Sequence, residues 1–140
     1  MTPVLRNIAA VVAGLLVGSL VNMGIVAAGP MLVPPPAGVD VTDPASLAAG
    51  IHLFEARHFA APFLAHALGT LAGAFVAWWV AGSHRAAFAW AIGVVFLAGG
   101  VAAATMIPAP AWFIAADLLL AYLPMAWLAI RLGRRLASAG

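Results

Sequence analysis

Three polar residues, Asn22, His66 and Asp117, lie inside long apolar stretches of the chain. Each falls six or seven residues from the same end of its stretch, which is about 9–10 Å deep at about 1.5 Å per helical residue. An ionisable group in hydrocarbon costs about 2.5–3.5 kcal/mol on insertion scales, so Asp117 requires a partner. His66 is the obvious partner, with Asn22 as a neutral donor or acceptor. Thr70 lies one helical turn beyond His66, and Tyr122 lies beyond Asp117 in its own stretch.

This polar layer has more than one interpretation. As a binding set, Asn22, His66, Thr70, Asp117 and Tyr122 would hold an ion or a small solute. As a catalytic set, His66 would be a general base or metal ligand, and Asp117 would orient it. As a purely structural set, the same residues would clasp the helices together by hydrogen bonds, as Asn and His do in membranes. The sequence leaves open whether the chain is an enzyme.

The densest polar stretch is "IHLFEARHF", residues 51–59, where His52, Glu55 and His58 are spaced three apart. Glu55 and His58 match the Glu-x-x-His pair of carboxylate-bridged di-metal bundles, but those sites need further carboxylates and the chain has four acids in all. A mononuclear divalent-metal site is chemically feasible with imidazole and carboxylate ligands. The favoured interpretation is a polar interfacial helix in which Arg57 extends toward water. No cofactor is therefore predicted from this stretch, and a divalent metal remains the alternative.

The composition describes the surroundings of these residues. Of 140 residues, 66% are hydrophobic and 7% are charged, and the mean hydropathy is +1.12. Soluble domains carry about 25% charged residues, so most of this surface must face lipid. The absence of Cys excludes disulfides, thiolate metal sites and Cys nucleophiles. The arginines form no basic stripe, so nucleic acid is not an expected partner.

Four apolar stretches are long enough to cross a bilayer, which takes about 20 residues per helix. We expect a single all-α domain, a bundle of four transmembrane helices with a short interfacial helix in the first outer loop. The expected spans are 8–29, 60–81, 86–107 and 111–132, and the expected outer loop is 30–59.

The arginines predict the orientation of the bundle. If the chain crosses four times, five of the six arginines fall on one side, whereas the other side holds the acidic first loop. Because positive residues stay in the cytoplasm, both termini are expected there, in a bacterial inner membrane. The five residues are Arg6, Arg85, Arg131, Arg134 and Arg135.

Small residues recur every four positions on two spans, and such faces let helix backbones approach closely in lipid. This pattern predicts a tight contact between the first and second spans, although the same faces could instead form a homo-oligomer. The small faces consist of Ala10, Gly14 and Gly18 on the first span and Ala65, Gly69, Gly73 and Ala77 on the second.

Prolines and tryptophans mark further features. The prolines from Pro30 onward are expected to exclude regular helix from the start of the outer loop. Asp43-Pro44 is a helix start, from which a stripe of apolar residues leads to His58. This helix is expected to continue into the second span with a bend at Pro62, and Pro124 is expected to kink the fourth span. The tryptophans fit an anchoring belt near the two membrane surfaces; they are Trp78, Trp79, Trp90, Trp112 and Trp127.

The segments "NMGIVAAGP", "HFAAPFLAHALGTLAGAFVAWWVAGSHR", "IPAPAWF" and "DLLLAYLPMAW" resemble those of small four-helix bacterial inner-membrane proteins. That resemblance spans nearly the whole chain and implies no named activity. The expected function is ion or small-solute binding or transport through an outward-facing polar site, with a membrane enzyme or an accessory subunit as alternatives. Expected partners are the lipid bilayer and a second copy or another membrane protein.

Overall fold

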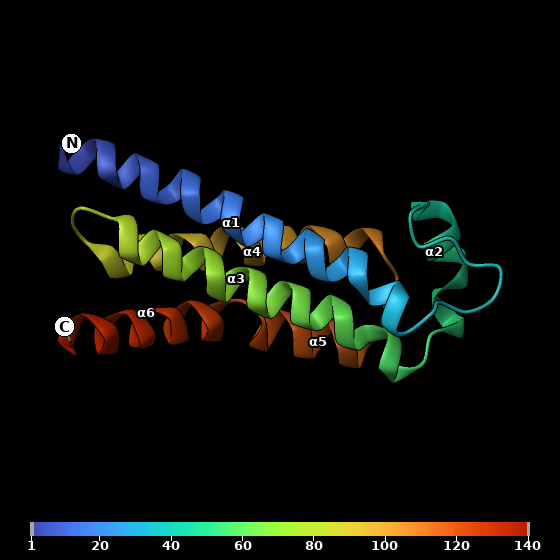
Figure 1. Cartoon of the computed structure of the whole chain (residues 1–140). Coiled ribbons are helices and arrows are strands. Elements are labelled where there is room, and N and C mark those ends of the chain that lie inside the picture. The colour runs from blue at the N-terminus through green and yellow to red at the C-terminus, as the bar shows by residue number, and fades with distance from the viewer. Residues whose placement is uncertain (1, 140) are drawn as a thin grey trace.

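A computed structural model describes residues 2–139 as helices joined by short links, with no strand in that range. Figure 1 shows long helices lying side by side, with one short helix beyond the end of the bundle. The α-helices are α1 (Pro3–Leu32), α2 (Pro44–Gly50), α3 (Ala60–Val80), α4 (Arg85–Met106), α5 (Ala111–Leu120) and α6 (Leu123–Ser138), and the 3-10 helices are η1 (Ile51–Leu53) and η2 (Ala56–Phe59).

The predicted all-α bundle with four spans is confirmed. Four helical segments are long and apolar enough to cross a bilayer, with mean hydropathies from 1.6 to 2.2, and many of their large apolar side chains lie on the outside. The chain is therefore a multi-pass membrane protein. The start of α1 and the end of α6 lie together at what we call the terminal end, and residues 33–59 occupy the opposite loop end (Figure 1).

The tightest helix pair is α1 with α3, as the small-residue spacing predicts. A Cβ added to Gly73 would lie 2.6 Å from the carbonyl oxygen of Gly14, and one added to Gly69 would lie 2.9 Å from that of Gly18. Real side chains do not tolerate such distances from backbone, so only glycine fits at these crossings. Close approach in lipid gains van der Waals contacts that bulky side chains would prevent.

Helices α3, α4 and α6 enclose the largest core cluster. Its members are five alanines and two isoleucines, together with Trp78, which is 5% exposed. The Trp78 ring lies against Gly133 of α6, where no side chain would fit, and the Arg85 guanidinium lies 5.0 Å from the ring centroid. Trp78 is thus a core residue and not part of an anchoring belt. The other four tryptophans are exposed, as anchoring predicts; these are Trp79, Trp90, Trp112 and Trp127.

Helix α1 is longer than predicted and contains Pro30. The expectation that Pro30 ends the helix was wrong. Proline removes the hydrogen bond to the carbonyl four residues earlier and its ring crowds that carbonyl, but the ring suits helical φ, so a helix can continue past it. The Val33 N–H still donates to the Gly29 carbonyl at 2.9 Å, and the helix stops only where Pro34 follows.

The short helix of the loop end begins as predicted. Asp43 caps α2, its carboxylate accepting from the Ser46 N–H at 3.0 Å, and Pro44 occupies the first turn. The prediction that this helix continues into the second span was wrong, because Phe54 and Glu55 adopt extended conformations that interrupt the helix. Glu55 therefore does not share a helical face with His66. Pro62 lies in the first turn of α3, where its missing N–H had no helical acceptor, so it causes no bend.

The fourth span is broken into α5 and α6 at residues 121–122. Pro124 was expected to kink this span, and the observed effect is larger: Pro124 stands in the first turn of α6. It has no N–H to donate to the Leu120 carbonyl, and the Tyr122 backbone (φ −118°, ψ −80°) is not helical. The break places Tyr122 beside Asp117.

Asn7, for which no role was predicted, holds the link between α3 and α4. The Asn7 Oδ1 accepts from the N–H groups of Gly82 (2.9 Å) and Ser83 (3.2 Å), and its Nδ2 donates to the Ser83 hydroxyl (2.9 Å). These bonds satisfy backbone donors of the link and fasten the start of α1 to it.

Candidate functional site

His66 and Asp117 form a direct pair between α3 and α5. The His66 Nδ1 lies 2.8 Å from Asp117 Oδ1, and the Tyr122 hydroxyl donates to Asp117 Oδ2 at 2.9 Å. Asp117 is 5% exposed, whereas the His66 side chain is 24% exposed. The acid inside the fourth span therefore has the compensating partners that its burial requires.

The surrounding elements hold this pair in place. The His66 and Tyr122 rings stack with centroids 5.8 Å apart. Tyr122 is buried against Gly100 of α4, and a side chain at Gly100 would occupy the space of the tyrosine hydroxyl. The break in the fourth span turns Tyr122 toward Asp117. Each oxygen of the carboxylate thus receives one donor from a different direction.

Hydrogen-bond roles follow from this geometry. If Asp117 is ionised, both of its oxygens accept, and the imidazole then donates through Nδ1–H. In neutral His66 the Nε2 then carries a lone pair and has no hydrogen-bond partner among residues 2–139. His66 borders a cavity, so this nitrogen is the exposed basic group of the pair. An imidazole oriented by a carboxylate is a geometry for accepting a proton or binding a donor.

The two other residues of the predicted layer are placed differently. Asn22 is half-buried on α1 and borders the same cavity, but none of the hydrogen bonds within residues 2–139 joins it to His66 or Asp117. Thr70 is fully buried, and its Oγ1 has no hydrogen-bond partner. The predicted trio is thus a connected pair, His66 and Asp117, extended by Tyr122, with Asn22 across the cavity.

A cavity of about 700 Å³ extends from this pair to the loop end of the bundle. Its walls come from α1, α3, α4 and α5, and residues of the segment 41–59 line it at the loop end, which we call its mouth. Its few polar side chains include Asn22, His58, His66 and Asp117, and the rest is mainly apolar. Sites for small molecules have about 300–1,000 Å³ and the same character, apolar walls with few polar groups. The mouth is bordered by Val41, Thr42, Leu47, Ile51, Phe54 and His58.

The stripe from Leu47 to His58, predicted as the apolar side of an interfacial helix, therefore faces the cavity mouth. It does so without being one helix. The segment before it is a turn closed by Thr42, whose hydroxyl and N–H both donate to Asp40 Oδ1 at 2.6 and 2.8 Å. These bonds hold the pKa of the Asp40 carboxyl below its usual value.

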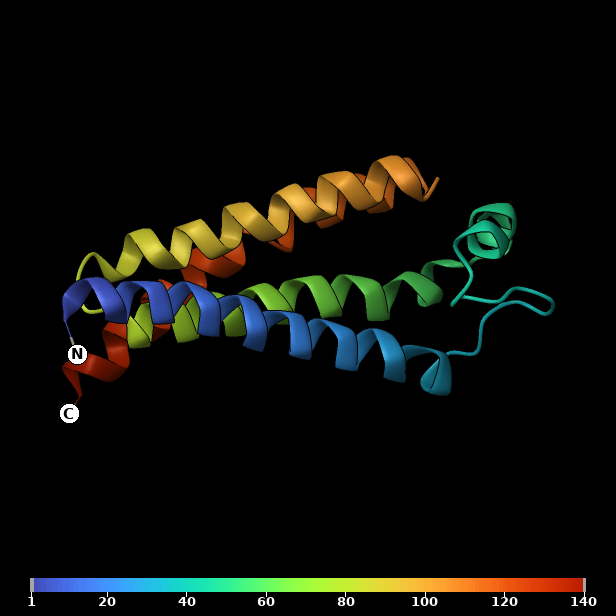
Figure 2. The same ribbon diagram turned by 90° about the horizontal axis from the view of Figure 1, so that it is seen from above.

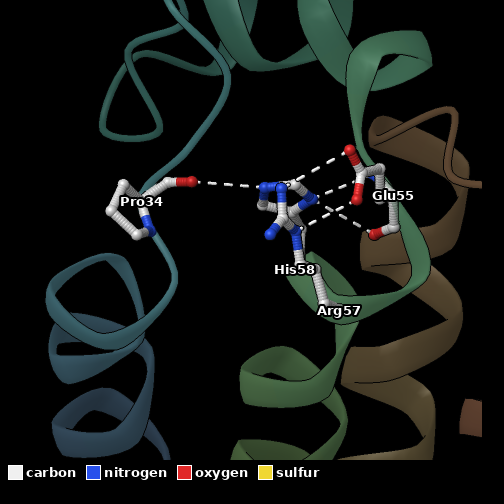
Figure 3. A network of polar contacts seen from close by, with 4 residues as sticks. All are labelled: Pro34, Glu55, Arg57 and His58. Carbon is white, nitrogen blue, oxygen red and sulfur yellow. Dashed lines mark hydrogen bonds and ion pairs between the residues drawn. The ribbon is translucent and has the colours of Figure 1, made fainter.

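The polar cluster of the loop end is shown in Figure 3. The Glu55 N–H donates to His58 Nδ1 at 2.9 Å, and His58 Nε2 donates to the Pro34 carbonyl at 3.2 Å. Arg57 pairs with Glu55 at 3.1 Å, with both side chains about two-thirds exposed, so the ion pair adds little stability. His58 thereby ties the end of α1 to the start of α3.

This cluster is not arranged as a metal site. Both ring nitrogens of His58 are engaged, and His52 is an exposed residue of η1. In the part of the chain that the structure describes, no three His, Cys, Asp or Glu side chains converge as ligands would. The hypothesis that His52, Glu55 and His58 bind a divalent metal thus gains no support from their placement, because the break at Phe54 and Glu55 disrupts the helical spacing it assumed.

The cavity and the contact between Gly100 and Tyr122 were not predicted from the sequence. A cavity arises from how far helices diverge, which local periodicity does not encode. Gly100 carried a weak signal, as one half of a Gly-Gly pair inside an apolar span. Comparison of the chain with protein-family models, with curated proteins and with solved structures found no match.

Proposed function

We propose that this protein binds a small, largely apolar molecule in the cavity and takes part in its transport. The observation that carries the proposal is the His66–Asp117 pair at the deep end of an apolar cavity of about 700 Å³. A purely structural clasp needs no cavity beside it. The pair would receive the polar group of the ligand, and the walls would cover its apolar part.

We further propose that the cavity opens to the periplasmic side of a bacterial inner membrane. The start of α1, the start of α4 and the end of α6 lie at the terminal end, so their arginines gather there (Figure 1). Positive residues stay in the cytoplasm, which directs the loop end and the cavity mouth outward.

Orientation can be tested with single cysteines, since the chain has none of its own. Ala37→Cys lies at the loop end and Ser138→Cys at the terminal end, and both positions are exposed. In intact spheroplasts an impermeant thiol reagent is expected to label position 37 and to reach position 138 only after permeabilisation. Labelling with the opposite preference would reverse the topology.

Binding can be tested by filling the cavity. Ala104→Phe places a ring in the α4 wall, whereas Ala102→Phe places the same ring on an exposed position of that helix outside the cavity. Native mass spectrometry of protein released from nanodiscs should detect a bound molecule in the wild type and in Ala102→Phe but not in Ala104→Phe. Identical spectra for all three proteins would contradict a cavity ligand and favour an accessory subunit.

A second candidate function, a membrane enzyme, is favoured by one specific observation. His66 Nδ1 contacts a carboxylate while its other nitrogen is unpaired beside the cavity, as a general base requires. The chemical identity of the recovered molecule separates the two functions. If His66→Gln carries a different molecule from the wild type, namely an unconverted substrate, the protein is an enzyme, whereas a binding protein would carry the same molecule in lower amount.

A further inference from the structure

We infer that the ligand of the cavity is an amphipathic amine, with a protonated nitrogen at the His66–Asp117 pair and an apolar body along the walls. This inference rests on the proposed binding function and specifies its ligand class. It is carried by the charge and the hydrogen-bonding character of the groups at the deep end and by the composition of the walls.

The deep end carries net negative charge when Asp117 is ionised and His66 is neutral. The Asp117 carboxylate receives hydrogen bonds from Tyr122 and His66, neither of which then brings a positive charge. Among residues 2–139, no arginine borders the cavity. Arg57, the arginine of the loop end, is paired with Glu55 and two-thirds exposed. A cation in the ligand would offset a charge that is costly to bury in a membrane.

The group of the polar pair that borders the cavity is an acceptor. His66 Nε2 presents a lone pair once Nδ1 donates to Asp117, whereas the Asn22 amide across the cavity can accept through its oxygen or donate through its NH2 group. His58 at the mouth has both nitrogens engaged. An alkylammonium group supplies three N–H donors, whereas a carboxylate supplies none. An acceptor beside a buried negative charge thus favours a ligand group that is both a donor and positively charged.

The walls select an apolar body. Met23 and Val26 of α1 border the cavity and are 67% and 46% exposed. On α4, Ala103 and Ala104 border it from the other side. Figure 2 shows α4 diverging from α1 and α3 toward the loop end. This part of the cavity is therefore bounded by exposed apolar residues, and a hydrocarbon chain would meet no polar side chain from α4.

The test uses three radiolabelled probes with the same chain, namely dodecylammonium, dodecanol and dodecanoate, at neutral pH. Each is titrated against wild-type protein in nanodiscs of zwitterionic lipid, and uptake by empty nanodiscs is subtracted. Dodecylammonium is expected to bind saturably and about tenfold or more tightly than dodecanol, because hydrogen bonds to charged groups are the strong ones. Dodecanoate is expected to bind weakest.

Two variants make the result specific. Asp117→Asn is expected to remove the preference for dodecylammonium over dodecanol while keeping binding of the alcohol. Ala104→Phe should abolish binding of both probes, and Ala102→Phe should change neither. Equal or tighter binding of dodecanol or dodecanoate by the wild type would overturn the amine inference and leave the proposed binding function intact. The amine inference would also be overturned if none of the three probes bound saturably while mass spectrometry still detected a cavity-dependent adduct. If neither probe binding nor such an adduct were detected, the proposed binding function would be overturned as well.

Discussion

Gly73→Leu is expected to lower the free energy of unfolding by about 3 kcal/mol or more, the upper end of the cost of overpacking. The first atom of the new side chain would already lie 2.6 Å from the Gly14 carbonyl oxygen. Backbone cannot move aside as a flexible side chain does, so α1 and α3 would have to separate. Unfolding in mixed micelles by titration with dodecyl sulfate measures the change.

Gly24→Leu is the matched control for this variant. Both glycines lie within long helices and gain helix propensity from leucine, by about 1 kcal/mol. A Cβ at Gly24 meets no atom within 4 Å, so the new side chain points into open space. If both variants unfold at the same dodecyl sulfate concentration, the α1–α3 contact does not stabilise the bundle.

The second large effect is expected at the polar pair. Asp117→Asn keeps the shape of the side chain and removes the charge that accepts from His66 and Tyr122. A double-mutant cycle with His66→Gln should give a coupling energy of about 1–2 kcal/mol, in the upper range for hydrogen bonds between membrane helices. The free energy of unfolding of the wild type, both single variants and the double variant is measured in the same micelles.

Asn7→Ala provides the comparison cycle with Asp117→Asn. Asn7 is hydrogen-bonded at the terminal end, fifteen residues before Asn22 and so about 22 Å from the level of the polar layer. Distant sites add within about 0.3–0.5 kcal/mol. A coupling between His66 and Asp117 that is no larger than this would mean that their contact is energetically silent.

The fold was largely predictable because the membrane reduces the problem to long apolar runs. Continuous stretches of about 20 residues can only be spans. The spacing of Gly14, Gly18, Gly69 and Gly73 also identified the helix contact in detail. Helix ends were less predictable. Pro30 lies inside α1 because a single proline costs one hydrogen bond, and neighbouring packing decides whether the helix continues.

The site was predictable in its residues but not in its shape. Depth along each span placed His66 and Asp117 at one level, and the cost of a buried acid predicted that they would pair. The same reasoning gave Asn22 an equal part, yet its side chain does not reach the pair. Depth fixes position along a helix but not rotation about it. The cavity depends on the divergence of α4 from its neighbours, which no residue pattern in the span encodes.

The break between α5 and α6 has a consequence for which substitutions the chain can accept. On the terminal side of the break, α6 packs into the core through Ala126, Ala129 and Gly133. Larger residues there would displace Trp78 and its neighbours. On the loop side of the break, α5 contributes Phe113 and Ile114 to the cavity wall, where a change in side-chain size alters the volume of the cavity. The two halves of one membrane crossing should therefore evolve under different constraints. Under the proposed binding function, variation in α5 would tune ligand specificity, while α6 keeps its small residues.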